Sequence, residues 1–343
     1  MTVRVNKPAV NLREELADLR KPTGIAGEAM LRAETVQEQF QLIGAGRRNW
    51  IINGDFSVSQ RGAFTTASTY TTGTYYVDRW KGGVSGSFTK QHKLNQTLPN
   101  GQITNSFRVT STGGAYASIQ QYVEDYSVFS GQLATLSFWA KTNKSGCTAS
   151  FYTVANQFDV VTDIVADDQW HYYKATALVP TGGTAMRPEV WTGTGSSSGD
   201  YVEIAQVQLE LGKVATPFEH ARSYGEELAL CQRYFYNLKY TATYQPVKAP
   251  CWMITTTVMQ GEFMHPVTMR TGPTLGNNGV GNFRVNDNLG GDQVCNSIAL
   301  GVTTENHTLI NFGKATANLS VGNCGYINTE VNNDAEFTFD AEL

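Results

Sequence analysis

Short stretches in which apolar and polar residues alternate constrain this chain more than any other feature. From Asn49 onward the alternation recurs, for example at 134–140, 170–180 and 201–209, and glycine- and serine-rich segments such as 193–199 separate the stretches. A period of two places successive side chains on opposite faces of a β-strand. Many short strands with frequent turns predict antiparallel sandwiches of the jelly-roll kind.

A short helical segment, residues 224–234, divides this β region. Beyond it, residues 235–343 return to strand patterns at 252–259, 262–264 and 336–341. These stretches are rich in aromatic and β-branched residues, which favour strands. We therefore expect a second β domain after the helix.

The first 48 residues follow a different pattern. Apolar residues recur there at spacings of three and four among charged residues, which predicts two amphipathic helices. Helices this short are marginal in water without a partner, so we expect an attachment or oligomerisation segment; packing on the protein's own body is the alternative. The two apolar seams consist of Leu12, Leu16, Leu19, Ala33, Val36, Phe40 and Ile43.

The expected fold is therefore mainly β, with a short N-terminal helical segment followed by two antiparallel β-sandwich (jelly-roll-like) domains. The expected domains are 1–48, 49–220 and 221–343.

Charge is unevenly distributed along the 343 residues. Residues 1–50 carry 14 of the 56 charged residues, whereas residues 51–343 carry the other 42, about 14% of those positions. The net charge of −4 gives no reason to expect nucleic-acid binding. We expect no membrane insertion and no secretory leader, because the chain has no long apolar run and no apolar core near Met1.

Catalytic and metal-binding patterns are weak. The five cysteines have no C-x-x-C spacing, and the chain contains neither a G-x-S-x-G nor an H-E-x-x-H motif. Asp167 and Asp168 could suggest a pair of glycosidase carboxylates, but adjacent strand residues point to opposite faces, so a solvated turn is the expectation. We expect no enzyme and no cofactor.

Aromatic residues make up 11% of the chain and could supply platforms for sugar rings. Trp191, just before a glycine- and serine-rich loop, is a candidate for an exposed platform, although core packing is the alternative. The turn-dense segment 276–296 is the expected contact surface. The candidate ligand-binding residues are Trp191, Trp252, Asn286, Asp287 and Asn288.

Two blocks of sequence are more specific than any motif above. The first is Asn49-Trp-Ile-Ile-Asn-Gly-Asp-Phe-Ser-Val-Ser-Gln-Arg-Gly62, followed by Tyr76-Val-Asp-Arg-Trp80. The second runs from Ile204 through Thr216-Pro-Phe-Glu219 to Glu227-Leu-Ala-Leu-Cys-Gln-Arg-Tyr234. Together they resemble the jelly-roll region of tail fibres of tailed bacteriophages. Residues 21–35 resemble the N-terminal segment of such fibres in some marine phages, and 339–343 resemble their end.

The resemblance implies a virion structural protein, a tail fibre that assembles as a homotrimer. Its N-terminus would join the tail through adaptor or nozzle proteins, and a carbohydrate-binding-module-like jelly roll would form its body. Residues 221–343 would form the distal domain that meets a host surface polysaccharide. A purely structural connector and, less favoured, a polysaccharide-degrading tailspike are the alternatives.

Related carbohydrate-binding jelly rolls often hold a structural calcium ion between their first and last strands. The first strand here offers Asn53 and Asp55, but the last has Ala205 and Gln206 where such modules place acidic residues. We therefore predict no metal site.

Overall fold

The computed structural model describes residues 48–343 except 154–156, 220–222, 248, 288–292 and 331–334, and for 153–162 the backbone alone. The two helical seams predicted in residues 1–48 lie outside the described residues. Within the described part, no helix is long and apolar enough to cross a bilayer.

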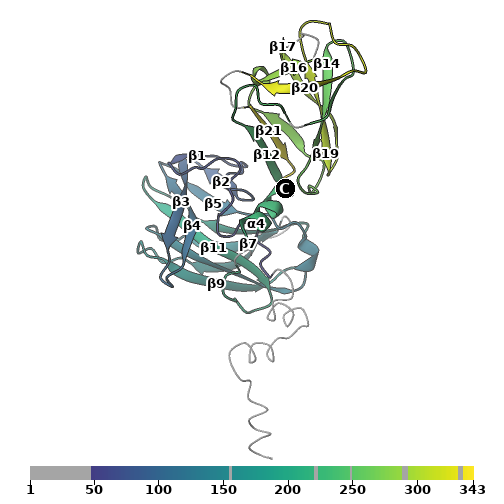
Figure 1. Cartoon of the computed structure of the whole chain (residues 1–343). Coiled ribbons are helices and arrows are strands. Elements are labelled where there is room, and N and C mark those ends of the chain that lie inside the picture. The colour runs from purple at the N-terminus through teal and green to yellow at the C-terminus, as the bar shows by residue number, and fades with distance from the viewer. Residues whose placement is uncertain (1–47, 154–156, 220–222, 248, 288–292, 331–334) are drawn as a thin grey trace, which may run out of the picture.

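The first sandwich consists of two antiparallel sheets that face each other across a hydrophobic core (Figure 1). The six-stranded sheet has the order β1 (Ser68–Tyr70), β3 (Phe88–Thr97), β4 (Ile103–Ser111), β11 (Tyr201–Leu211), β6 (Leu133–Thr142) and β9 (His171–Leu178). The five-stranded sheet has the order β2 (Lys81–Ser85), β5 (Tyr116–Gln120), β10 (Met186–Trp191), β7 (Thr148–Thr153) and β8 (Gln157–Asp163). A 3₁₀ turn, η1 (Tyr126–Val128), follows β5.

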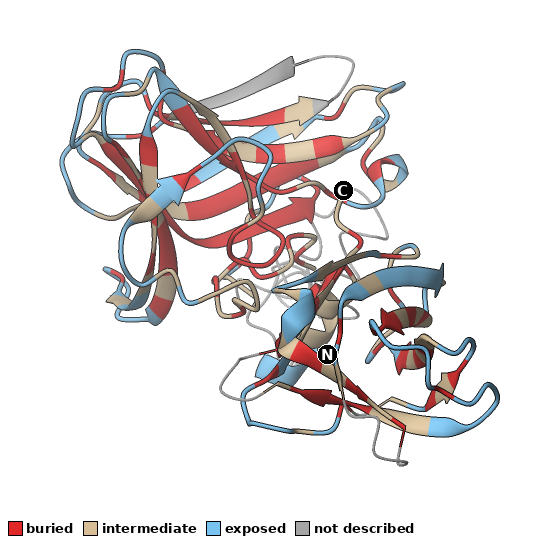
Figure 2. Cartoon of the chain, turned by 90° about the horizontal axis from the view of Figure 1, so that it is seen from above, coloured by how far each residue is buried: buried red, intermediate tan, exposed pale blue. Residues whose placement is uncertain are grey.

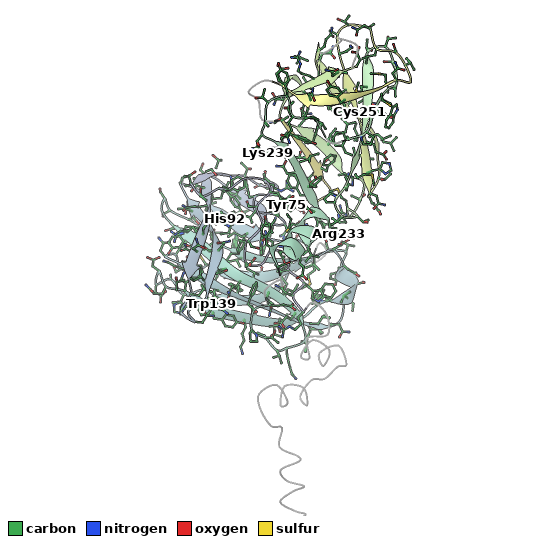
Figure 3. The ribbon with its side chains drawn as sticks, viewed as in Figure 1. Tyr75, His92, Trp139, Arg233, Lys239 and Cys251 are labelled. Atoms are coloured by element: carbon green, nitrogen blue, oxygen red, sulfur yellow. The ribbon has the colours of Figure 1, made fainter. Side chains whose placement is uncertain are left out.

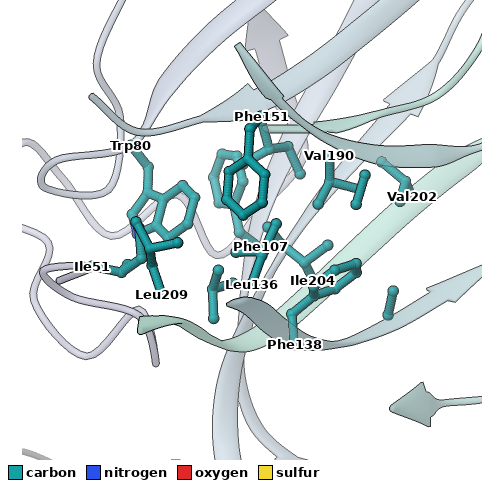
Figure 4. Packing of buried hydrophobic residues seen from close by; sticks show 14 of the residues in the cluster. Ile51, Trp80, Phe107, Leu136, Phe138, Phe151, Val190, Val202, Ile204 and Leu209 are labelled. Atoms are coloured by element: carbon teal, nitrogen blue, oxygen red, sulfur yellow. The ribbon is translucent and has the colours of Figure 1, made fainter. Parts of the chain in front are cut away.

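Large side chains from both sheets fill the space between them (Figure 4). Phe107 and Phe138 come from the six-stranded sheet and Phe151 from the five-stranded sheet, and each is at most 1% exposed. Trp80 packs beside them, with its ring centroid 4.9 Å from that of Phe56. Burying each such side chain contributes about 1.5–3 kcal/mol, so this core stabilises the first sandwich.

Strand β11 is buried along its whole length, although Glu203 and Glu210 alternate with core residues such as Ile204 and Leu209 and point away from the core. Polar partners explain this. The Glu203 carboxylate accepts hydrogen bonds from Arg108 Nε at 2.7 Å and Ser106 Oγ, and Glu210 accepts one from the Thr216 backbone N–H at 3.0 Å. The predicted strands at 134–140, 170–180 and 201–209 are confirmed as β6, β9 and β11.

The second sandwich has its own core, built largely from phenylalanine rings. Phe283 stacks on Phe337 with ring centroids 4.4 Å apart, and Phe312 meets Phe337 edge-on. Its smaller sheet has the order β12 (Phe235–Tyr240), β21 (Ala335–Asp340) and β15 (Thr274–Asn277). The larger sheet has the order β17 (Gln293–Val294), β16 (Phe283–Asn286), β20 (Cys324–Thr329), β13 (Cys251–Met253), β14 (Val258–Met264), β19 (His307–Gly313) and β18 (Ser297–Thr303), with a 3₁₀ turn η2 (Val280–Asn282) before β16.

These two sandwiches confirm the mainly β architecture. Figure 2 shows buried residues gathered in the strands and exposed residues in the loops. One predicted strand is wrong: 252–259 is a hairpin in which β13 pairs with β14 and the backbone turns between them, with Ile254 N–H donating to Val258 O at 3.0 Å. Three consecutive threonines carry strand propensity here but occupy the turn.

The predicted helical segment is confirmed as α4 (Tyr224–Gln232), which lies between the two sandwiches (Figure 1). The Ser223 side chain accepts a hydrogen bond from Glu226 N–H and caps the helix. One turn later, the buried Glu227 carboxylate accepts a hydrogen bond from Asn53 N–H in the first sandwich. The helix is thereby fixed to the loop that precedes β1.

Asn53 is the centre of a buried hydrogen-bond network in that loop. Its side-chain amide donates to the carbonyls of Val58 and Asp78 at 2.8 and 2.9 Å, and its Oδ1 accepts from Val58 N–H. Its own carbonyl accepts from Trp80 Nε1 at 2.8 Å. With φ at 58°, Asn53 is in the left-handed region, which asparagine adopts more readily than most residues.

Arg79 joins the first sandwich to the end of the second. Its guanidinium is 1% exposed, pairs with the Glu342 carboxylate and donates to the Tyr122 carbonyl at 2.7 Å. It also lies 3.5 Å from the ring centroid of Tyr234. Figure 3 shows Tyr75 and Arg233 in the same region, where the two sandwiches meet. We call this set of contacts the joint.

Asp78, next to Arg79, has an unusual carboxyl group. Its pKa is raised from 3.8 to about 7, mainly by burial and also by the nearby Glu342 carboxylate, whereas Gln60 N–H, which donates to Asp78 Oδ2 at 2.6 Å, and Arg61 lower it. The folded protein therefore favours protonated Asp78 below about pH 7, and the stability cost of this group accumulates between about pH 4 and pH 7 and stays constant above that range.

Replacing Phe138 by alanine removes a fully buried ring and should lower the free energy of unfolding by about 3–5 kcal/mol. Leu178→Ala is the matched control, because Leu178 is 63% exposed at the end of β9 and its loss should cost at most about 0.5 kcal/mol. Urea denaturation measures both. Equal effects of the two substitutions would contradict the assigned core.

Replacing Asp78 by asparagine should change the pH dependence of stability. The folded pKa lies above the unfolded one, so the wild type loses stability as the pH rises from about 4 to about 7, by up to roughly 4 kcal/mol, and the loss ends above that range. The variant lacks this loss, so its stability relative to the wild type should rise across the same range. Thermal unfolding at pH 5 and pH 8 compares them; a difference that does not vary with pH would refute the assignment.

Candidate functional site

The outward face of the five-stranded sheet carries a groove of about 580 Å³. Strand β10 explains why: Met186, Pro188 and Val190 point into the core, which leaves Arg187 and Glu189, with Trp191, on the outside. The residues that line the groove are Thr72, Gly83, Val84, Tyr116, Ser118, Gln120, Thr148, Ser150, Tyr152, Arg187, Glu189 and Trp191.

Aromatic rings stand at two ends of the groove along β10. At one end Trp191 and Tyr116 meet edge-on with ring centroids 5.9 Å apart, and Tyr116 is 39% exposed. At the other end Tyr152 lies opposite Arg187 in the antiparallel register. Arg187 and Trp191 are four residues apart on one strand, so the two ends are separated by roughly 13 Å.

The floor between the rings holds an ion pair. Arg187 Nη2 lies 3.0 Å from Glu189 Oε2, and the two side chains are 17% and 12% exposed. The guanidinium is fixed on its other sides, because Nη1 donates to the Tyr122 hydroxyl at 3.0 Å and the group lies 4.2 Å from the Tyr152 ring centroid. Burial raises the pKa of Glu189, and Arg187 and Ser150 oppose that rise.

Small side chains leave the rest of the groove floor open. Gly83 of β2 pairs with Ser118 of β5, and a Cβ atom at position 83 would lie 2.5 Å from Ser118 Oγ. In the next cross-strand row, Glu189 of β10 lies between Gln120 of β5 and Ser150 of β7. Hydroxyl, amide and carboxylate groups therefore share one surface with the aromatic rings.

A second, smaller cavity of about 270 Å³ lies at the joint and is mostly apolar. Trp50, Leu230 and Tyr234 line it together with Arg79 and Tyr122. Tyr122 thus lines this cavity while its hydroxyl contacts the Arg187 side chain of the groove. The groove and the joint share this residue.

The structure brings one of the candidate ligand residues, Trp191, into the groove. Trp252 and Asn286 belong to the second sandwich, on β13 and β16 of the larger sheet. Asp287 is 5% exposed with its carboxylate 4.0 Å from the buried Lys314 ammonium, so a surface ligand would not reach it. Asn288 lies outside the described residues. Segment 276–296, expected to be loops, also contains η2, β16 and β17.

Two alternatives weighed from the sequence, a carboxylate pair at 167–168 and a calcium site near Asn53, can be located in the structure. Asp167 and Asp168 lie in an exposed turn, where Asp167 pairs with His171. Asn53 and Asp55, considered for calcium, hydrogen-bond to backbone N–H groups of Val58 and Ser57. In the part of the chain that the structure describes, no group of three His, Cys, Asp or Glu side chains could hold a metal ion.

The sequence analysis missed most of the groove, including Tyr116, Tyr152, Arg187 and Glu189. A signal was present in residues 186–191, where charged and aromatic residues occupy every second position. Pro188 obscured it, because proline is rare in central strands. The Pro188 carbonyl accepts a hydrogen bond from the N–H of Gln121, the first residue after β5. The side of Pro188 that lacks an N–H therefore faces the end of β5.

Comparison with known proteins gives limited likenesses. No protein-family model matches the chain, and no curated protein matches it significantly in sequence. Among solved structures, the enzymatically active domain of tailspike protein 4 of bacteriophage CBA120 is 20% identical, with a TM-score of 0.33; the match covers 48% of this chain and 21% of the tailspike chain.

Two carbohydrate-binding modules also match. The CBM22-1 xylan-binding domain of Xyn10C from Paenibacillus barcinonensis is 11% identical, with a TM-score of 0.29, and the match covers 45% of this chain and 99% of that domain. TmCBM61, solved with β-1,4-galactotriose, is 16% identical, with a TM-score of 0.27, and the match covers 48% of this chain and all of that one. With likenesses at this level, the function is inferred from the residues of the groove.

Proposed function

We propose that this protein is a tail fibre of a tailed bacteriophage and binds a host surface glycan in the groove on the five-stranded sheet. The observation that carries the binding proposal is the combination of aromatic rings and hydrogen-bonding groups in one groove. A sugar ring offers apolar C–H faces that pack on aromatic rings and hydroxyl groups that hydrogen-bond to polar side chains. Ligand sites commonly combine such apolar walls with a few polar groups.

The chemistry of the floor suits an uncharged sugar. Arg187 and Glu189 neutralise each other's charge. A charged group on a sugar would therefore find no unpaired opposite charge on the floor. The Arg187 guanidinium carries five N–H donors and its side chain is 17% exposed, so a hydroxyl group reaching the floor could accept a hydrogen bond from it. The neighbouring Glu189 carboxylate could accept a hydrogen bond from the next hydroxyl of the same ring.

The resemblance of the N-terminal segment supports attachment through residues 1–48 to tail adaptor or nozzle proteins, with assembly as a homotrimer in the virion. Several copies of a weak site would raise the apparent affinity by roughly 10²–10⁴ without new contacts. The groove lies within 49–220, so it moves the proposed recognition surface from the second sandwich, where we expected it, to the first.

We propose binding without hydrolysis. Glycoside hydrolysis ordinarily uses two carboxyl groups that flank the scissile bond. Among the residues lining the groove, Glu189 is the one carboxylate, and Arg187 holds it. A connector without a ligand remains the alternative function; it would leave the exposed rings and the paired floor without a role.

Trp191→Ala should weaken polysaccharide binding roughly tenfold or more, because it removes a central aromatic contact. Trp139→Ala is the matched control: Trp139 lies on β6 of the other sheet, where its ring pairs with Tyr172. Affinity electrophoresis against xylan, galactan, mannan and surface polysaccharide from candidate hosts measures both. Equal losses would refute the groove, and release of reducing sugar would favour a tailspike.

The full chain should have the mass of a trimer in solution, and deletion of residues 1–48 should reduce it if the predicted apolar seams join the copies. Light scattering after gel filtration measures both proteins. Excess free protein should also protect host cells from infection. A monomer at all concentrations would contradict the trimer, and binding to tail proteins but never to cells would favour the connector.

A further inference from the structure

We infer that the second sandwich completes the glycan groove of the first: Tyr122 positions Arg187, and Glu342, through Arg79, positions Tyr122. The inference rests on the proposed function, because it concerns affinity in the same groove. It assigns a role in binding to a contact between the sandwiches that lies outside the groove itself. Each link in it is a direct contact between two named groups.

The first link is the contact between Tyr122 and Arg187. Tyr122 follows β5 and its hydroxyl accepts a hydrogen bond from Arg187 Nη1 at 3.0 Å, on the side of the guanidinium away from Glu189. Its ring lies 5.5 Å from the same guanidinium. Without this acceptor, Arg187 would keep the Glu189 pair but lose one of the contacts that fix its orientation. An arginine held in one orientation loses less conformational entropy when a ligand binds.

The second link fixes Tyr122 from the other side. Its carbonyl accepts a hydrogen bond from Arg79 Nη2 at 2.7 Å, and Arg79 Nη1 pairs with the Glu342 carboxylate. Arg79 and Glu342 are 1% and 4% exposed, so the buried Arg79 charge depends on Glu342 for compensation, while Glu342 also pairs with Arg61 Nη2 at 3.2 Å. The backbone at Tyr122 is therefore anchored by a side chain of the second sandwich's last segment.

A parallel contact reaches the groove edge. Lys81 lies opposite Gln120 in the cross-strand row that contains Glu189, and its Nζ donates to the Leu343 carbonyl at 3.2 Å. The same carbonyl accepts a hydrogen bond from the Tyr75 hydroxyl. The segment that carries Glu342 thus also contacts β2, the strand at the edge of the five-stranded sheet.

The chain offers a control at the same joint. The Asn237 side-chain amide on β12 donates a hydrogen bond to the Gln60 carbonyl at 3.0 Å. This contact also joins the two sandwiches, but it involves none of Arg79, Tyr122 and Glu342. Asn237→Ala therefore weakens the joint without removing a contact on the route from Glu342 to Arg187.

The test measures affinity of the full chain for the polysaccharide of the above panel that the wild type binds best. Tyr122→Phe removes the acceptor alone and should weaken binding roughly three- to tenfold. Glu342→Gln should weaken it roughly two- to tenfold, and Asn237→Ala should leave it unchanged. Unfolding curves for each variant confirm that the proteins compared are folded; Tyr122→Phe, which keeps the ring and the buried ion pair, serves as the test if Glu342→Gln does not fold.

A double-mutant cycle separates positioning from general destabilisation. In an Arg187→Lys background, which lacks the planar guanidinium, Tyr122→Phe should cost little further affinity, whereas a merely structural role predicts the same fold-loss in both backgrounds. Additive losses, wild-type affinity in both Tyr122→Phe and Glu342→Gln, or an equal loss in Asn237→Ala would overturn the inference while leaving glycan binding intact. Failure of the wild type to bind any polysaccharide would overturn the proposed function and the inference with it.

Discussion

The buried ion pair between Arg79 and Glu342 is the contact on which the arrangement of the two sandwiches depends. A buried charge is costly unless its donors or acceptors are satisfied. Arg79 is compensated by groups from three places: the Glu342 carboxylate, the Tyr122 carbonyl and the face of the Tyr234 ring, although its Nε has no hydrogen-bond partner in the described structure. Since these groups belong to both sandwiches, separating the sandwiches would leave Arg79 and Glu342 without their partners. The joint is therefore specific in its geometry.

The segments that carry the resemblance to phage tail fibres meet at this joint. Asn53, Asp78 and Arg79 come from the first block, and Glu227 and Tyr234 from the second. Asn53 hydrogen-bonds to the Asp78 carbonyl and to Glu227, and Arg79 lies over Tyr234. These polar residues stand in otherwise apolar runs because they hold the first sandwich, α4 and the second sandwich together. Their role in the structure is architectural.

The groove draws on different residues, most of them on regular strands. Strand residues are held by ladder hydrogen bonds on both sides, so their side chains keep a fixed spacing on the sheet. The aromatic ends and the Arg187–Glu189 floor are thereby preorganised before a ligand binds. Preorganisation reduces the conformational entropy that is lost on binding. The joint and the groove are separate in sequence, yet Tyr122 belongs to both.

The sequence by itself determined the features that depend on local pattern. Period-two alternation predicted β6, β9 and β11, and the helical segment at 224–234 predicted α4. Trp191 stood out because a glycine- and serine-rich loop follows it. The turn in 252–259 could not be read, since threonine favours strands whether or not it occupies one.

The tertiary structure alone decided which strands became neighbours. β10 lies between β5 and β7, so Glu189 meets Gln120 on one side and Ser150 on the other, residues far away in the chain. Alternation fixes the face on which a side chain stands but not what stands beside it, because strand order is set by burial of the whole core. For that reason Trp191 was the one groove residue among the five sequence candidates, and the fold supplied the groove around it.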